Sequence, residues 1–294
     1  MWKLFFIKKW VYVLKAYLIS KGVKDSKFIR SLPHSIKNFL TRLLAHNQPF
    51  LTKVHGLPMY IYPNTFETIC YHYQPYEPFT TELFEQAIQP AATVLDIGAQ
   101  FGYFSLIAAR KVGHGGCVYS FEPAPANFEL LQRNIELNRY IDIICAVPKA
   151  VGSQHAMQKL FVYQGSDSHS MYCHPKVNVK NTIMVECISI DEFLGEQRVD
   201  VIKMDIEGNE AYALEGMKKT IARSNNLKLF IEFSPANLNR AGVKPQEYLS
   251  QLTSLGFDIK LIDERSRSLT PIQRDFAVPN VPIWYANLYC TKKR

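Results

Sequence analysis

The sequence predicts an α/β fold in which helices cover a largely parallel sheet. Its 294 residues are 47% hydrophobic and 20% charged, which supplies enough apolar side chains for a large buried core. From residue 92 onward, short apolar runs that end at an acidic residue or a glycine alternate with stretches of helical length. These two observations exclude disordered, collagen-like and low-complexity proteins.

The positive charge is concentrated at the N-terminus. The formal net charge is +8, and residues 1–30 contain eight Lys or Arg residues and one acid, Asp25. The nearly neutral remainder argues against an extended nucleic-acid interface, because such interfaces need many Lys and Arg contacts. Uncharged runs within residues 2–19 are at most five residues long, too short to cross a bilayer or to act as a secretory signal.

We therefore expect a cytoplasmic protein with a basic, amphipathic helical extension at residues 1–50 and one domain at 51–294. The extension has three possible roles. It docks peripherally on the anionic inner face of a membrane, it packs on the body of the protein, or it forms a homodimer contact. The six cysteines form no CxxC pair and no zinc-ligand spacing, which favours reduced thiols.

The domain is expected to begin with a hairpin-containing segment at 51–75. Residues 54–62 and 65–73 read as two strands on either side of Pro63-Asn64. Residues 76–88 then predict a helix, with Thr80 or Thr81 as its cap. A short apolar strand follows and ends at Asp96. After a glycine turn, the next helix is expected to begin near Tyr103.

The turn has the pattern Asp-x-Gly-x-x-x-Gly, formed by Asp96, Gly98 and Gly102. A dinucleotide site places a pyrophosphate at this position, and an acid before the first glycine would repel it. S-adenosylmethionine has no phosphate and carries an ammonium and a sulfonium group. The pattern therefore predicts that Asp96 faces the cation, and that backbone N–H groups of residues 98–100 bind the carboxylate of this cofactor.

The next elements extend the same site. Residues 116–121 predict a strand that ends at Glu122, 26 residues after Asp96, where a carboxylate can accept both ribose hydroxyls. Pro123 and Asn127 precede a predicted helix at 128–138. A third strand at 141–145 leads to residues 150–152, where Val151 is expected to cover the adenine ring.

Two later segments, VDVIKMDIEG at 199–208 and LFIEFSP at 229–235, complete a set of linked motifs. Together with DIGAQFGYFSL and FEPAPANFELLQRN they resemble the FkbM family of S-adenosylmethionine-dependent methyltransferases over residues 54–262. The resemblance implies a class I methyltransferase fold, with a seven-stranded, mostly parallel sheet and helices on both faces. It also implies O-methylation of a hydroxyl on a sugar, glycolipid or polyketide.

The resemblance assigns cofactor positions by motif, with Gln100 where the family more often has Asn. It also suggests that His169 and Ser170 border the active site, because residues 164–170 resemble a Ser-rich loop of the family. The cofactor positions implied are Asp96, Gly98, Ala99, Gln100, Gly102, Tyr103, Glu122 and Asp205.

Proton removal from the acceptor hydroxyl needs a base at the carboxyl ends of the central strands. Asp205, Glu207 and Glu232 are expected there, with His169 as an alternative base and Lys203 as an ion-pair partner of the acids. Asp205 and Glu232 are also the only candidate ligands for Mg²⁺, and the sequence offers no obvious third oxygen ligand.

Three functions remain open at this point. The first is an O-methyltransferase for a sugar, glycolipid or related natural product, held at the inner membrane face. The second is a soluble secondary-metabolite O-methyltransferase of the polyketide type, dimerising through its N-terminal helix. The third is a membrane-associated module that binds the cofactor without catalysis, which three clustered acids argue against.

Overall fold

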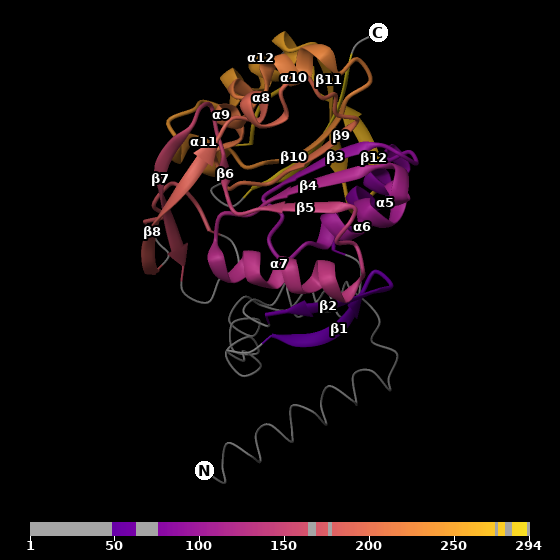
Figure 1. Cartoon of the computed structure of the whole chain (residues 1–294). Helices are drawn as coiled ribbons and strands as arrows, with labels where there is room; N and C mark the ends of the chain where they lie inside the picture. The colour runs from indigo at the N-terminus through magenta and orange to yellow at the C-terminus, as the bar shows by residue number, and fades with distance from the viewer. Residues whose placement is uncertain are drawn as a thin grey trace, which may run out of the picture.

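The computed structural model describes residues 49–62, 76–163, 169–175, 178–273, 276–279 and 284–292. Within these ranges, eight strands form one sheet in the order β12-β11-β13-β10-β9-β3-β4-β5 (Figure 1). Five of them run parallel, namely β3 (Thr93–Ile97), β4 (Cys117–Phe121), β5 (Ile144–Val147), β9 (Val201–Met204) and β10 (Lys228–Phe233). The expected mostly parallel sheet is confirmed.

The described sheet has eight strands, one more than the seven expected. Strand β13 (Ala286–Lys292) pairs antiparallel with both β10 and β11 (Phe257–Asp263). Strand β12 (Ser268–Pro271), which directly follows β11 in the chain, pairs antiparallel with it and adds an eighth strand at that edge. This short, exposed strand lacks the apolar run by which a buried strand is recognised in a sequence.

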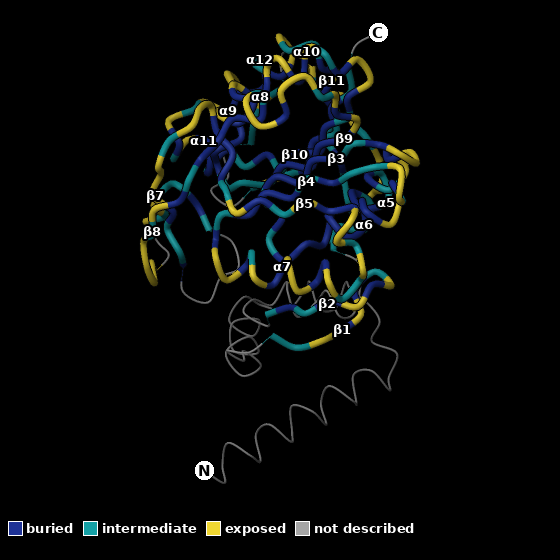
Figure 2. The backbone as a smooth tube through the Cα atoms, viewed as in Figure 1, coloured by how far each residue is buried: buried dark blue, intermediate teal, exposed yellow. Residues whose placement is uncertain are grey.

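Helices cover both faces of the sheet because its strands are apolar on both sides. On one face lie α5 (Pro78–Ala87), α6 (Tyr103–Val112) and α7 (Pro125–Leu137), which pack on side chains such as Val94. The opposite face packs through Leu95 against the helices α8 (Ile190–Leu194), α9 (Glu210–Glu215), α10 (Lys218–Arg223), α11 (Pro235–Arg240) and α12 (Pro245–Ser254). The central strands are consequently the most buried part of the molecule (Figure 2).

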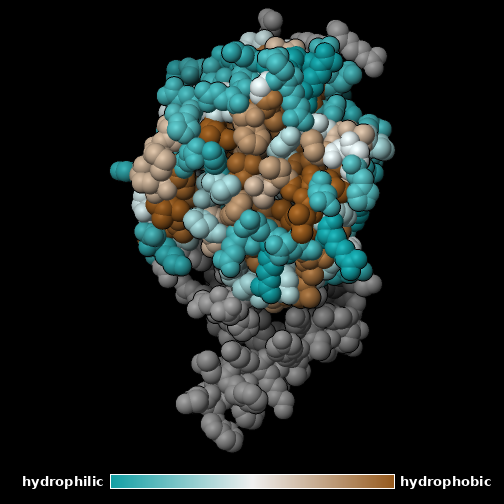
Figure 3. Space-filling model, viewed as in Figure 1, coloured by the Kyte–Doolittle hydropathy of each residue, from teal (hydrophilic) through white to brown (hydrophobic). Residues whose placement is uncertain are grey.

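A second, three-stranded sheet lies beside the carboxyl ends of the central strands (Figure 1). It is made of β6 (Ala150–Val151), β8 (Val179–Ile188) and β7 (Ala156–Tyr163). In the view of Figure 3, hydrophilic side chains cover the upper helices, and hydrophobic side chains gather near the middle, where β5 forms the edge of the large sheet. That sheet edge is therefore bordered by apolar surface.

The N-terminal hairpin turns at residues 55–56, inside a segment predicted as a single strand. Strands β1 (Phe50–Val54) and β2 (Leu57–Ile61) are joined by His55 and Gly56, both with positive φ. Two left-handed central residues are typical of the tight turns that match strand twist. The prediction of one strand across 54–62 is therefore wrong, because it reads through this turn. Residues 63–73, including Pro63-Asn64, lie outside the described ranges.

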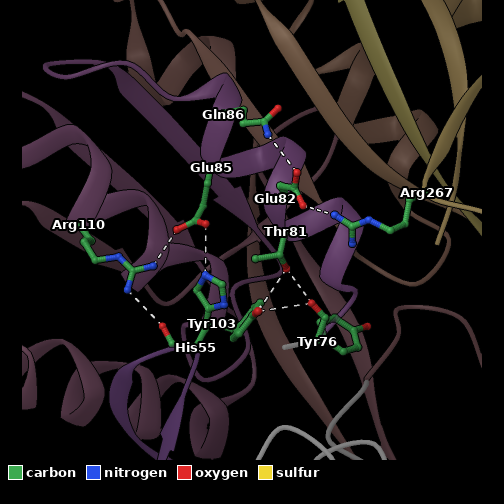
Figure 4. Close-up of polar contacts among 9 residues, drawn as sticks. All are labelled: His55, Tyr76, Thr81, Glu82, Glu85, Gln86, Tyr103, Arg110 and Arg267. Carbon is green, nitrogen blue, oxygen red and sulfur yellow. Dashed lines mark hydrogen bonds and ion pairs between the residues drawn. The ribbon is translucent and has the colours of Figure 1, made fainter. Parts of the chain in front are cut away.

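The hairpin turn is held against α5 and α6 by a polar cluster (Figure 4). His55 Nε2 lies 3.2 Å from Glu85 Oε2, and Arg110 donates to Glu85 Oε1 at 2.7 Å. A second Arg110 nitrogen donates to the carbonyl of His55 at 3.2 Å. With its two nitrogens, the Arg110 guanidinium thus bridges a helix carboxylate and the backbone of the turn.

Helix α5 begins differently from the prediction. Its N-cap is Glu77, with φ of 42°, while Thr80 and Thr81 lie inside the helix. The cap comes instead from Glu264, just after β11, whose two carboxylate oxygens accept the N–H groups of Phe79 and Thr80 at 2.9 and 2.8 Å. The Thr80 or Thr81 cap is therefore wrong, because a tertiary contact supplies the acceptors.

The other predicted elements agree more closely with the structure. The helix expected near Tyr103 begins at that residue, and the helix expected at 128–138 begins three residues earlier at Pro125. No described helix is both long and apolar enough to cross a membrane. The 1–50 extension lies almost wholly outside the described residues, so its helical, membrane and dimer roles stay predictions, as do the 1–50 and 51–294 domain boundaries.

Candidate active site

A cavity of about 350 Å³ opens where the parallel strands end. Residues at or just after the carboxyl ends of strands β3, β4, β9 and β10 line it, as expected for a ligand site in an open α/β sheet. Of the predicted site residues, Gly102 and Ser170 do not line this cavity. Those that do are Asp96, Gly98, Ala99, Gln100, Tyr103, Glu122, Pro123, Asn127, Val151, His169, Lys203, Asp205, Glu207 and Glu232.

The glycine turn is tight because two loops meet there. Gly98 has φ of 87°, and a Cβ at this position would lie 1.9 Å from the carbonyl oxygen of Asp205. The amide of Asp205 in turn donates to the carbonyl of Ile97 at 2.9 Å. A side chain at Gly98 would therefore push apart the β3 and β9 loops that form the floor of the cavity.

The backbone amides of this turn are not directed at a ligand. Gly98 and Ala99 donate to the carbonyl of Phe121 at 3.0 and 2.9 Å, and Gln100 donates to Glu122 Oε2 at 2.8 Å. The prediction that the amides of residues 98–100 bind the cofactor carboxylate is therefore wrong. The three N–H groups hold the loop after β3 against the end of β4.

Glu122 is held in place from two sides. Its second oxygen accepts the N–H of Ala124 at 2.9 Å, and Asn127 also hydrogen-bonds to the carboxyl group. Burial raises the pKa of Glu122 to about 7, against the opposing effect of these hydrogen bonds. Each oxygen of a carboxylate has more than one acceptor position, so a group fixed in this way can still accept ribose hydroxyls from the cavity.

Asp96 is buried at the end of β3. The Ser105 hydroxyl donates to Asp96 Oδ2 at 2.5 Å, and Ser120 donates to Ser105 at 2.8 Å. Burial raises the pKa of Asp96 to about 6, and the Ser105 hydrogen bond opposes that rise. Asp96 thus lines the cavity as a carboxylate oriented by two serines from α6 and β4.

A buried ion pair lies at the centre of the cavity wall. Lys203 on β9 is 1% exposed, and its Nζ lies 3.3 Å from Asp205 Oδ2 and 5.0 Å from the centre of the Phe104 ring. Burial alone would lower the pKa of Lys203, but the surrounding acids, Asp205 first among them, outweigh it and raise the pKa. Lys203 is therefore charged and partners the acids, as expected from the sequence.

Glu232 extends this cluster from the neighbouring strand. Ile231 of β10 pairs in register with Met204 of β9, so Glu232 and Asp205 follow one another across the two strand ends. Burial and the adjacent charge of Asp205 raise the pKa of Glu232 well above its ordinary value. This shift favours the protonated form of Glu232, in which the carboxyl group can donate a hydrogen bond.

The loop after β9 is shaped by local hydrogen bonds. Glu207 has φ of 53°, and its carboxylate accepts from Asn237 Nδ2 at 2.6 Å. Glu210 accepts the N–H groups of Ile206 and Gly208 at 3.2 and 3.1 Å, which fixes the turn from within. This arrangement brings Glu207 to the cavity beside Asp205.

The segment after the described end of β7 contributes the opposite rim. Ser170 donates to the carbonyl of Glu207 at 2.8 Å, while His169 lines the cavity. His169 thus borders the cavity as the resemblance suggests, whereas Ser170 contacts the backbone of the loop after β9 without lining the cavity. Residues 164–168 lie outside the described ranges.

Several lining residues were not recognised in the sequence. Tyr76 lines the cavity, and its ring meets the Tyr103 ring edge-on at 5.9 Å. The hydroxyls of Thr81 and Tyr103 lie 3.2 Å apart, and Thr81 donates to the carbonyl of Tyr76 at 2.7 Å (Figure 4). Nearby, Glu77 is half-buried close to Lys203, and its buried Oε2 atom has no hydrogen-bond partner among the described residues.

No sequence motif marks Glu77, since it falls at the start of a predicted helix. Burial raises its pKa to about 7, and Lys203 counteracts that rise. Other lining residues that the sequence did not single out include Lys149, Leu160, Met171, Ile206 and Asn209.

The chemistry of the wall is acidic and partly apolar. The described residues contain no group of three or more His, Cys, Asp or Glu residues arranged to hold a metal ion. A Mg²⁺ site at Asp205 and Glu232 is therefore not supported. What the wall offers is carboxylate oxygen for hydroxyls and cations, and apolar surface on one side.

A model of the methyltransferase FkbM domain matches residues 96–259, more than half of the chain. The chain belongs to the FkbM methyltransferase family. The matched range contains Glu122 and the acidic residues around Lys203. This FkbM chain therefore carries an S-adenosylmethionine-dependent methyltransferase domain. The resemblance seen in the sequence motifs is confirmed.

Three relatives are similar in sequence. Methyltransferase 1 of Beauveria bassiana is 29% identical over 145 residues, which span 42% of this chain and 57% of that protein. Methyltransferase sdnD of Sordaria araneosa is 25% identical, over 62% of this chain and 80% of its own length. Hexuronic acid methyltransferase AglP of Haloferax volcanii is 26% identical, over 61% of this chain and 66% of its own.

Solved structures are more distant. An S-adenosylmethionine-dependent O-methyltransferase of Thermotoga maritima shares 13% identity, with a TM-score of 0.44 over 83% of this chain and 78% of that chain.

Proposed function

We propose that this FkbM protein is an O-methyltransferase that moves a methyl group from S-adenosylmethionine to a hydroxyl of a sugar, a glycolipid or a related natural product. The observation that carries the proposal is the single cavity that joins a fixed carboxylate, Glu122, to an acidic cluster around Lys203. The name of AglP, a hexuronic acid methyltransferase, supports a sugar acceptor.

The residues present fit the cofactor. Glu122 is positioned to accept ribose hydroxyls, and Val151 and Leu160 offer apolar surface to an adenine ring. Asp96 and Asp205 supply negative charge for an ammonium and a sulfonium group. When bound, S-adenosylmethionine supplies an activated methyl group, so the protein has to position the acceptor and manage its proton.

The acids divide into different roles by their environment. Burial and the charge of Asp205 raise the pKa of Glu232, and its protonated form is suited to donate a hydrogen bond to an acceptor oxygen. Asp205, held by Lys203, and His169, on the opposite rim, are the candidates to accept the hydroxyl proton. Glu207 is engaged by Asn237 and is better placed to orient the acceptor than to take its proton.

The test is a methyl-transfer assay that measures S-adenosylhomocysteine formation with a panel of neutral glycosides, uronides, glycolipids and phenolic polyketides. We expect turnover with a glycoside or glycolipid. Asp205→Asn should lower kcat by about a hundredfold or more, as for loss of a general base. Asp142→Asn, an exposed acid remote from the cavity wall, serves as the matched control and should keep full activity.

Three other results would count against this proposal. Turnover of the polyketides alone would favour a secondary-metabolite enzyme. Cofactor binding without methyl transfer to any member of the panel would favour a non-catalytic module. Full activity of Asp205→Asn would remove Asp205 from proton transfer.

A further inference from the structure

Asn134, in the middle of α7, is completely buried, and its side-chain amide is fully used. Its Oδ1 accepts the N–H of Tyr60 at 2.7 Å, and its Nδ2 donates to the carbonyl of Tyr60 at 2.9 Å. The second Nδ2 hydrogen goes to the carbonyl of Phe101 at 2.8 Å. The amide therefore pairs with β2 as a neighbouring strand would and, with its remaining donor, reaches the glycine turn.

In that turn, Phe101 lies between two residues with a left-handed backbone: Gln100, with φ of 53°, and Gly102, with φ of 96°. A non-glycine residue in the left-handed region is strained and persists only where its surroundings hold it. The N–H of Gln100 is the donor that fixes Glu122 Oε2. A short covalent and hydrogen-bonded path thus runs from Tyr60 through Asn134 and the turn to Glu122.

The neighbouring side chains of α7 contact the same hairpin without reaching the turn. Asn138, one helical turn later, donates to the carbonyl of Pro58 at 2.8 Å and to its own helix at Asn134 O. The Arg133 guanidinium lies 3.4 Å from the centre of the Tyr60 ring. Of these three residues, Asn134 hydrogen-bonds to both the hairpin and the cofactor turn.

We propose that Asn134 is a positioning residue of the cofactor site. By donating to Phe101 while it is anchored on Tyr60, it holds the left-handed turn that presents the Gln100 amide to Glu122. The N-terminal hairpin thereby becomes part of the support of the ribose-binding carboxylate. This inference rests on the proposed binding of S-adenosylmethionine.

The substitution Asn134→Asp tests the proposal with almost no change in volume. A carboxylate cannot donate, so it loses the bonds to the carbonyls of Tyr60 and Phe101 and faces them with oxygen. In calorimetric titration with S-adenosylmethionine, we expect Kd to rise by at least about tenfold. Asn138→Asp is the matched control, with the same exchange on the same helix and hairpin. Its Kd should change by less than about twofold.

A double-mutant cycle separates positioning from general destabilisation. If Asn134 acts through Glu122, Asn134→Asp should weaken binding by less than about threefold in a Glu122→Gln background. A full tenfold loss in that background would overturn the proposal, as would equal affinities of Asn134→Asp and the wild type. Failure of the folded wild type to bind S-adenosylmethionine would instead overturn the proposed function.

A measurement on the wild-type protein covers the case in which Asn134→Asp does not fold. Hydrogen exchange of the Tyr60 amide, which donates to Asn134, should slow when S-adenosylhomocysteine saturates the cavity, because coupling between two sites is reciprocal. Slowing at Gln100 with unchanged exchange at Tyr60 would show that the hairpin is not coupled to the site.

Discussion

Three consecutive amides of the glycine turn donate to the protein itself, to Phe121 and to Glu122. The sequence pattern correctly placed Asp96, Gly98 and Glu122 at one cavity, because each follows a strand and strand ends meet at one edge of a parallel sheet. It could not show the direction of the amides. That depends on where the Phe121 carbonyl lies, which local spacing does not reveal.

Gly98→Ala should be among the most damaging small substitutions. The new Cβ would overlap the Asp205 carbonyl and would have to adopt φ of 87°. We expect the free energy of unfolding to fall by about 3 kcal/mol or more in chemical denaturation. Gly242→Ala is the control, since Gly242 has φ of 79° and open space around it. Its loss should be only about 1 kcal/mol, and equal losses would refute the steric argument.

At the scale of elements, the predictions succeeded where the signal is local. Helix α6 starts at Tyr103 because Gly102 ends the turn, and α7 starts at Pro125, whose fixed φ suits a first helical position. They failed at two elements, for different reasons. The hairpin turn at His55-Gly56 was missed because apolar residues flank it, and the α5 cap was missed because Glu264 lies far along the chain.

The cap of α5 yields a test at this scale. Glu264→Ala removes both acceptors of the helix N-terminus and a favourable negative charge, so it should lower the free energy of unfolding by about 1–2 kcal/mol. Glu247→Ala, which removes an exposed ion pair with Lys244, should change it by less than about 0.5 kcal/mol. Denaturant midpoints at constant m-value measure both, and an unchanged midpoint for Glu264→Ala would show that the cap contributes nothing.

Across the whole molecule, buried acids accumulate around one end of the sheet. Burial raises the pKa of Glu77, Glu122 and Glu210 to about 7 and that of Asp96 to about 6. Sequence reasoning identified every acid that lines the cavity. It missed Glu77, which lies near Lys203 but does not line the cavity, and it could not separate an acid that holds a loop, such as Glu210, from one that faces a ligand.

These raised values imply that stability depends on pH. Between about pH 4.5 and pH 7 the folded state holds protons that the unfolded state has released, so the free energy of unfolding should fall as the pH rises through this window. Thermal unfolding at pH 5, 6 and 7.5 measures it. Glu210→Gln, which mimics the protonated form, should reduce the fall by about 3 kcal/mol. Exposed Glu192→Gln should leave the slope unchanged. A flat wild-type profile would contradict the assignment.

The central claim is that this acidic cavity binds S-adenosylmethionine through Glu122. Calorimetric titration of the wild type, Glu122→Gln and exposed Glu136→Gln tests it most directly. We predict binding by the wild type, the same affinity for Glu136→Gln, and at least about a tenfold rise in Kd for Glu122→Gln, which cannot accept both N–H groups that hold it. A folded wild type that takes up no S-adenosylmethionine would contradict the claim, and unchanged affinity of Glu122→Gln would remove Glu122 from it.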